Sequence, residues 1–150
     1  MENTNSRTNR LPISKYLIAG LLAGLIAAVV NNIYHLSYSA ITGVEFKVVV
    51  NVLTVTLASI VPLVLAGLVY QALDNNTNKA TVIFVIMTIF LTICSMGSMA
   101  VPVFPNREEV PEGFYGLTLP MHFIAGGIAA IVIPRYIASQ KKKQQVKETA

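Results

Sequence analysis

The chain has 150 residues, of which 54% are hydrophobic and 12% are charged, and its net charge is +4. Soluble domains are about 25% charged, so this composition excludes an ordinary soluble domain. The basic residues flank long apolar stretches, and no basic face with interleaved aromatic residues occurs. We therefore expect no nucleic-acid partner.

Four stretches without Asp, Glu, Lys or Arg follow one another along the chain. They are 29, 26, 27 and 22 residues long, and a helix needs about 20 apolar residues to cross a hydrocarbon core of about 30 Å. The sequence therefore predicts an all-α membrane protein, an antiparallel bundle of four transmembrane helices within residues 16–138. The predicted spans are 16–38, 48–71, 80–103 and 117–137.

Polar segments flank this predicted domain. Residues 1–15 are rich in Asn, Thr and Arg, and we expect a disordered cytoplasmic N-terminus there. Residues 139–150 form a basic tail, which we expect to be cytoplasmic and mobile. Three lysines of this tail are candidates for contact with anionic lipid headgroups: Lys141, Lys142 and Lys143.

The first span carries small and polar residues on one face: Gly20, Gly24, Ala27, Ala28, Asn31 and His35. Small residues mark helix contact faces in lipid, because they let two backbones approach. We therefore expect this face to pack against other helices. The second span has Pro62 near its centre, where we expect a loosened or kinked helix.

The polar residues of the four spans share a depth. Spans one and three end at the outer side, and spans two and four begin there. This places one polar set in the outer half: Asn31, Asn32, His35, Asn51, Thr54, Ser95, Ser98 and His122. The inner half is almost purely aliphatic. The sequence thus predicts a polar outer cavity above a closed inner half.

The distribution of Lys and Arg predicts the orientation. Both termini and the middle loop hold nine of these residues, whereas the opposite side holds Lys47 and Arg107 alone. Positively charged loops stay on the cytoplasmic side. We therefore expect a multi-pass protein with both termini in the cytoplasm.

Two functions are open at this point. The polar set is a candidate ligand-binding site for a small molecule or a membrane partner, including a second copy of the chain. The alternative is a redox or metal protein that holds a metal or haem through His35 and His122. The same polar residues also suit purely structural hydrogen bonds between helices.

An enzyme is less expected than a binding protein. No carboxylate pair lies in a span, and no Gly-rich phosphate loop occurs. The leading prediction includes no cofactor.

Sparse motifs spread over about residues 15–138 resemble a family of small four-span bacterial membrane proteins known only as a domain of unknown function. The motifs are Asn31 or Asn32, the segment 58–62 (Ala-Ser-Ile-Val-Pro), Ser95 or Ser98 before Pro102, Met121-His122, and Ile133-Pro134. The resemblance implies a location in the bacterial inner membrane. It implies no activity.

Overall fold

The computed structural model describes residues 10–44, 50–97 and 112–149. Nearly all of these residues lie in four helices, which confirms the predicted all-α class. The helices are α1 (Ile13–Thr42), α2 (Val52–Asn76), α3 (Ala80–Gly97) and α4 (Phe114–Thr149). Helices α1, α2 and α4 are long and apolar enough to cross a membrane, and α3 is a shorter apolar helix.

Several helix ends differ from the predicted spans, because an apolar window does not mark where a helix stops. Helix α2 starts at Val52 rather than at residue 48, since the Asn51 side chain caps it. It continues to Asn76, five residues beyond the predicted end of the span at residue 71. The last six residues of the predicted third span, 98–103, lie outside the described residues.

The structure also differs from the two predicted tails. Helix α1 begins at Ile13, inside the segment expected to be disordered, and Pro12 is its N-cap; residues 1–9 lie outside the described part. Helix α4 runs through the predicted basic tail to Thr149. This tail is rich in Lys and Gln, which are good helix formers.

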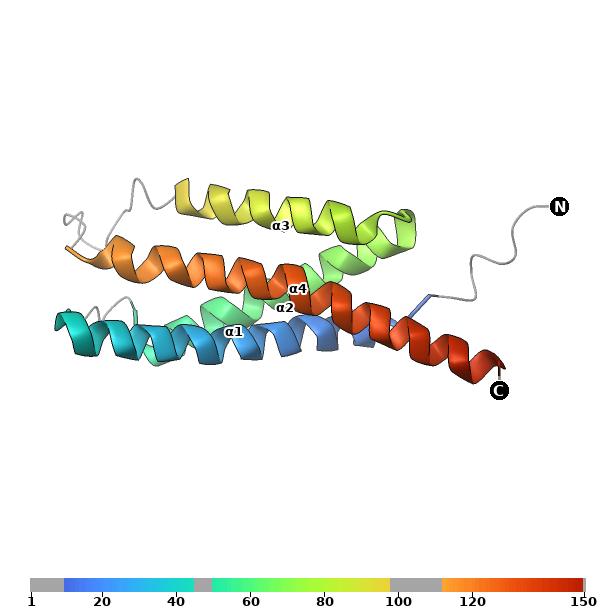
Figure 1. Cartoon of the computed structure of the whole chain (residues 1–150), viewed down its shortest axis with the longest axis horizontal. Helices are drawn as coiled ribbons and strands as arrows, with labels where there is room; N and C mark the ends of the chain where they lie inside the picture. Colours follow the sequence, from blue (N-terminus) through green and yellow to red (C-terminus); the bar gives the residue numbers. More distant parts are fainter. Residues whose placement is uncertain (1–9, 45–49, 98–111, 150) are drawn as a thin grey trace.

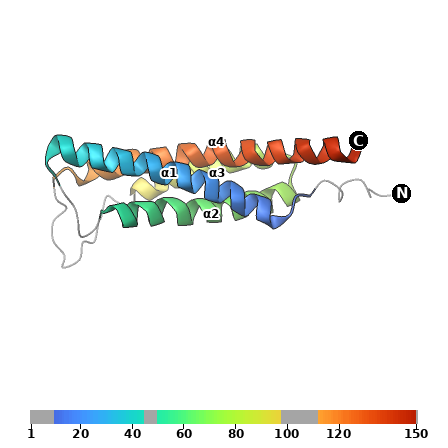
Figure 2. The same ribbon diagram turned by 90° about the horizontal axis from the view of Figure 1, so that it is seen from below.

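Consecutive helices run in opposite directions, so that the start of α1 and the end of α4 lie at the same end of the molecule (Figure 1). We call this the middle-loop end, because the turn between α2 and α3 also lies there. The opposite end, where α1 ends and α2 begins, is called the first-loop end. Figure 2 shows α4 running alongside α1 for most of its length.

Helices α1 and α2 pack backbone against backbone through glycine, which confirms the predicted contact face of the first span. A Cβ atom on Gly24 would lie 2.8 Å from the Cα of Ile60. A Cβ on Gly20 would lie equally close, 2.8 Å, to the Cα of Val64. Both distances are too short for real atoms, so any larger residue must push α1 away from α2.

Polar contacts join the helices at the middle-loop end. The Tyr16 hydroxyl of α1 donates to Asp74 of α2, and Lys141 of α4 forms an ion pair of 2.7 Å with the same carboxylate. Tyr70 of α2 shares a 2.8 Å hydrogen bond with Thr81 of α3. The apolar core of this end contains Tyr16, Leu63, Tyr70, Phe84, Ile133 and Ile137.

The described parts of α2 and α3 meet near this turn. The rings of Tyr70 and Phe84 pack edge to face there, with centroids 5.0 Å apart. Toward the first-loop end the two helices diverge, and α3 stays beside α4 (Figure 1). This divergence leaves room for the cavity described next.

Candidate functional site

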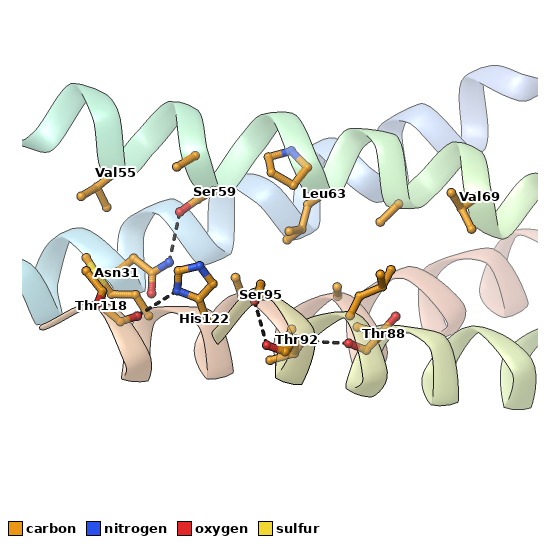
Figure 3. Close-up of a pocket in the computed structure, with 18 of the residues that line it drawn as sticks. Asn31, Val55, Ser59, Leu63, Val69, Thr88, Thr92, Ser95, Thr118 and His122 are labelled. Atoms are coloured by element: carbon orange, nitrogen blue, oxygen red, sulfur yellow. Dashed lines mark hydrogen bonds between the residues drawn. The ribbon is translucent and has the colours of Figure 1, made fainter. Parts of the chain in front are cut away.

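A cavity of about 460 Å³ lies between α2, α3 and α4, and Asn31 of α1 contributes to its wall (Figure 3). Its lining is mainly apolar, with polar side chains gathered toward the first-loop end. The polar lining residues are Asn31, Thr54, Ser59, Thr88, Thr92, Ser95, Thr118 and His122. None of the lining residues that the structure describes is Asp, Glu, Lys, Arg or Cys, so the cavity wall is uncharged while His122 is neutral.

The cavity opens sideways between α2 and α3. Ala58, Pro62 and Val69 of α2 line it and are exposed, as are Met87 and Leu91 of α3. The other side of α3 is closed against α4.

That closure depends on a glycine of α4. A Cβ at Gly126 would collide with the Thr92 hydroxyl. Gly126 therefore lets α3 lie directly on α4.

Asn31 and Ser59 are the most deeply buried polar residues of the site. The Asn31 Nδ2 donates to the Ser59 hydroxyl over 3.1 Å, and the two residues are 4% and 2% exposed. The Asn31 Oδ1 is buried and has no hydrogen-bond partner in the part of the chain that the structure describes. Buried polar atoms are normally paired, and this oxygen, on a residue that lines the cavity, can only accept a hydrogen bond.

His122 presents a second acceptor. Its Nδ1 lies 2.9 Å from the Thr118 carbonyl oxygen, which can only accept a hydrogen bond. The neutral ring therefore carries its proton on Nδ1, and Nε2 is left with a lone pair. Figure 3 shows this second nitrogen turned away from Thr118, toward α2.

Three hydroxyl groups of the lining donate their protons to carbonyl groups of their own helices. Thr92 donates to the Thr88 carbonyl (2.8 Å), Ser95 to the Thr92 carbonyl (2.7 Å), and Thr118 to the Phe114 carbonyl (2.9 Å). Such bonds are usual for Ser and Thr in helices. They turn the oxygen lone pairs, rather than the protons, toward other groups.

Proline adds a further acceptor. Pro62 has no N–H, so the carbonyl of Ala58, four residues earlier, loses its helical donor. Both residues line the cavity. The Asn31 Oδ1, the His122 Nε2 and this carbonyl are acceptors, and they suit a ligand that donates hydrogen bonds.

The remaining residues of the predicted site have other roles. Asn51 caps α2, and its side chain accepts from the N–H groups of Leu53 and Thr54, both over 3.0 Å. Thr54 completes this capping box and also lines the cavity. The Nδ2 of Asn32 donates to Ala28 and Thr56, and Asn32 does not line the cavity. Ser98 lies outside the described residues.

The two histidines do not share the cavity. His35 is buried on α1 and does not line the cavity, whereas His122 does. In the described ranges, no three His, Cys, Asp or Glu side chains gather where one metal ion would bind them. The placement of the histidines therefore gives no support to a shared metal or haem.

Four polar lining residues were not among the predicted site residues: Ser59, Thr88, Thr92 and Thr118. Thr88, Thr92 and Ser95 recur at helical spacing, and this is the signal that could have identified them. Ser59 lies seven residues, or about two helical turns, after Val52 in α2. Its only sequence signal is a hydroxyl in an otherwise apolar run.

The chain was compared with protein-family models, with curated proteins and with solved structures, and none of them matches it. The resemblance to the four-span bacterial family stays a prediction.

Proposed function

We propose that this protein is a multi-pass membrane protein that binds a small amphipathic ligand in the cavity between α2, α3 and α4. The role is binding rather than catalysis, because the site offers hydrogen-bond acceptors and apolar surface. It contains neither a carboxylate pair nor a nucleophile–base pair among its described lining residues.

All four helices cross the membrane in this proposal. Helix α3 completes the set of four spans, because its 18 residues cover about 27 Å. This length is close to the thickness of a hydrocarbon core. The nine-to-two distribution of Lys and Arg supports cytoplasmic termini. The resemblance to bacterial four-span proteins supports the bacterial inner membrane.

Reporter proteins test this topology. We expect fusions after Lys143 and within residues 75–78 to report the cytoplasm, and a fusion near Glu109 to report the opposite side. A C-terminal fusion that reports the far side of the membrane contradicts the four-span arrangement.

One observation carries the binding proposal: Asn31, whose Oδ1 has no hydrogen-bond partner among the described residues, lines a cavity of about 460 Å³. Ligand sites typically measure about 300–1,000 Å³ and combine apolar walls with a few placed polar groups. The Asn31 amide nitrogen donates an interhelical hydrogen bond to Ser59, but the amide oxygen takes part in no such bond among the described residues.

Filling the cavity tests the proposal. Ala58 lines the cavity at its opening, and Val61 lies one turn away on α2, is exposed and does not line it. We expect protein with Ala58→Phe, purified in lipid nanodiscs, to lose a molecule that the unchanged protein and the Val61→Phe control retain. The molecule is detected by mass spectrometry of solvent extracts. Equal retention by both variants, or retention by none of the three proteins, contradicts the proposal.

A further inference from the structure

We infer that the ligand is a neutral lipid: a hydrocarbon chain whose head is a hydroxyl group, taken up from the bilayer through the opening between α2 and α3. This inference rests on the proposed function and names the class of ligand. It follows from the polarity along the cavity, the kind of polar groups, the absence of charge among the described lining residues and the direction of the opening.

Polarity changes along the length of the cavity. Asn31, Ser59 and His122 lie toward the first-loop end, whereas Leu63, Val69 and Phe84 line the part nearer the middle-loop end. Figure 3 shows this order, with Asn31 and His122 at one end and Val69 at the other. An amphipathic molecule matches the gradient when its head lies beside Asn31 and its chain points toward Val69.

The cavity is long enough for a lipid chain. Its wall on α2 extends from Thr54 to Val69, which is about 22 Å at the helical rise of 1.5 Å per residue. One leaflet of a hydrocarbon core is roughly 15 Å thick. A chain of leaflet length therefore fits with room left for its head.

The polar groups select a neutral donor. The Asn31 Oδ1, the His122 Nε2 in its neutral ring and the Ala58 carbonyl all accept hydrogen bonds. No Lys or Arg stands among the described lining residues to balance a phosphate, sulfonate or carboxylate, and burying an unpaired charge is costly. A hydroxyl head donates its proton to one of these acceptors and brings no charge.

The opening determines where the ligand comes from. Apart from Thr54, the exposed lining residues are apolar, among them Val69, Met87 and Leu91. In a membrane, this opening faces hydrocarbon rather than water. A ligand dissolved in the bilayer thus reaches the cavity without leaving the apolar phase.

Three photoactivatable probes with one shared chain test the inference: a long-chain alcohol, the corresponding alkane and the corresponding sulfonate. The full chain is placed in phosphatidylcholine nanodiscs, and adducts on cavity peptides are quantified by mass spectrometry. A buried hydrogen bond contributes roughly 0.5–1.5 kcal/mol, so we expect the alcohol to bind about twofold to tenfold more tightly than the alkane. The sulfonate should bind less tightly than the alkane.

Two variants separate the head from the chain. His122→Phe and Asn31→Leu each remove one acceptor, and either should bring the alcohol closer to the alkane while alkane labelling persists. Asn31 also donates a hydrogen bond to Ser59, so Asn31→Leu can prevent folding. In that case the His122→Phe variant alone provides the test.

The outcomes distinguish this inference from the proposed function. Equal labelling by alcohol and alkane, preference for the sulfonate, or an unchanged preference in both variants overturns the neutral-alcohol ligand but leaves ligand binding intact. If no probe labels the cavity and Ala58→Phe changes nothing that the protein retains, the proposed function fails as well.

Discussion

Gly24 sets the distance between α1 and α2, since the space for its missing side chain is occupied by the backbone of α2. The Cα of Ile60 lies 2.8 Å from where a Cβ would stand. Gly127 of α4 offers a matched contrast, because a Cβ there meets no atom within 4 Å. The two positions separate the helical propensity of alanine from its size.

We expect Gly24→Ala to destabilise the protein by about 1–3 kcal/mol, the usual cost of overpacking. Gly127→Ala should be neutral or stabilising by up to about 1 kcal/mol, since alanine favours the helix. Thermal unfolding in detergent measures both. Equal effects of the two substitutions would show that α1 and α2 do not pack through Gly24.

Individual polar residues show how far the sequence determines the site. The position of Asn31 on the same helical face as Gly20 and Gly24 predicted that it turns toward other helices, and it lines the cavity. Asn51 was grouped with it because of depth alone. The spacing Asn51-x-x-Thr54 is a helix-capping pattern, and this local role accounts for the Asn51 side chain.

At the scale of the helix, α4 contains two prolines yet stays helical from Phe114 to Thr149. Pro120 deprives the Gly116 carbonyl of its helical donor. The Tyr34 hydroxyl of α1 replaces that donor over 2.7 Å. The irregularity of one helix is thus satisfied by a side chain of another, which ties α1 to α4 near the first-loop end.

This arrangement predicts a thermodynamic coupling. Tyr34→Phe should cost about 1 kcal/mol, because it leaves the Gly116 carbonyl unpaired. In a Pro120→Ala background the restored N–H serves that carbonyl, so the same change should cost much less. The free energy of unfolding of the four proteins gives the coupling.

Tyr38→Phe is the control for this cycle. The Tyr38 hydroxyl bonds the Gly113 carbonyl (2.9 Å), which also accepts from the Leu117 N–H. The loss of unfolding free energy caused by Tyr38→Phe should therefore be smaller than that caused by Tyr34→Phe, and it should not depend on Pro120. Additive effects of Tyr34→Phe and Pro120→Ala would contradict the replacement of the donor by Tyr34.

Helix ends were predicted less well than helices. Hydropathy marks where lipid contact stops, but α4 continues through Lys141 and α2 continues through Asp74. These two residues form an ion pair between the extended ends. A long-range contact of this kind leaves no trace in the local apolar pattern, so the sequence alone did not place it.

At the scale of the whole molecule, the divergence of α2 from α3 creates the cavity. The two helices are consecutive in the predicted antiparallel bundle, and they do meet at Tyr70 and Phe84. Their separation beyond that point was not predicted, because helices that are apolar all round carry no pattern that assigns their contact faces. The cavity consequently reaches Ala66 and Val69, in the half expected to be closed.

The central claim is that a ligand occupies this cavity from within the bilayer, and a tryptophan placed at its mouth tests it most directly. The natural chain has no Trp, so one introduced residue reports alone. Met87 lines the cavity and is 37% exposed, while its neighbour Ile86 is 62% exposed and does not line it. Each is replaced by Trp, and a brominated long-chain alcohol is added to the bilayer as quencher.

We predict that quenching of the Met87→Trp protein saturates at low quencher, as the filling of a discrete site requires. Quenching of the Ile86→Trp protein should rise in proportion to the brominated fraction of the bilayer, as for a residue that meets bulk lipid. If both proteins show the same proportional rise, α2 and α3 enclose no binding site.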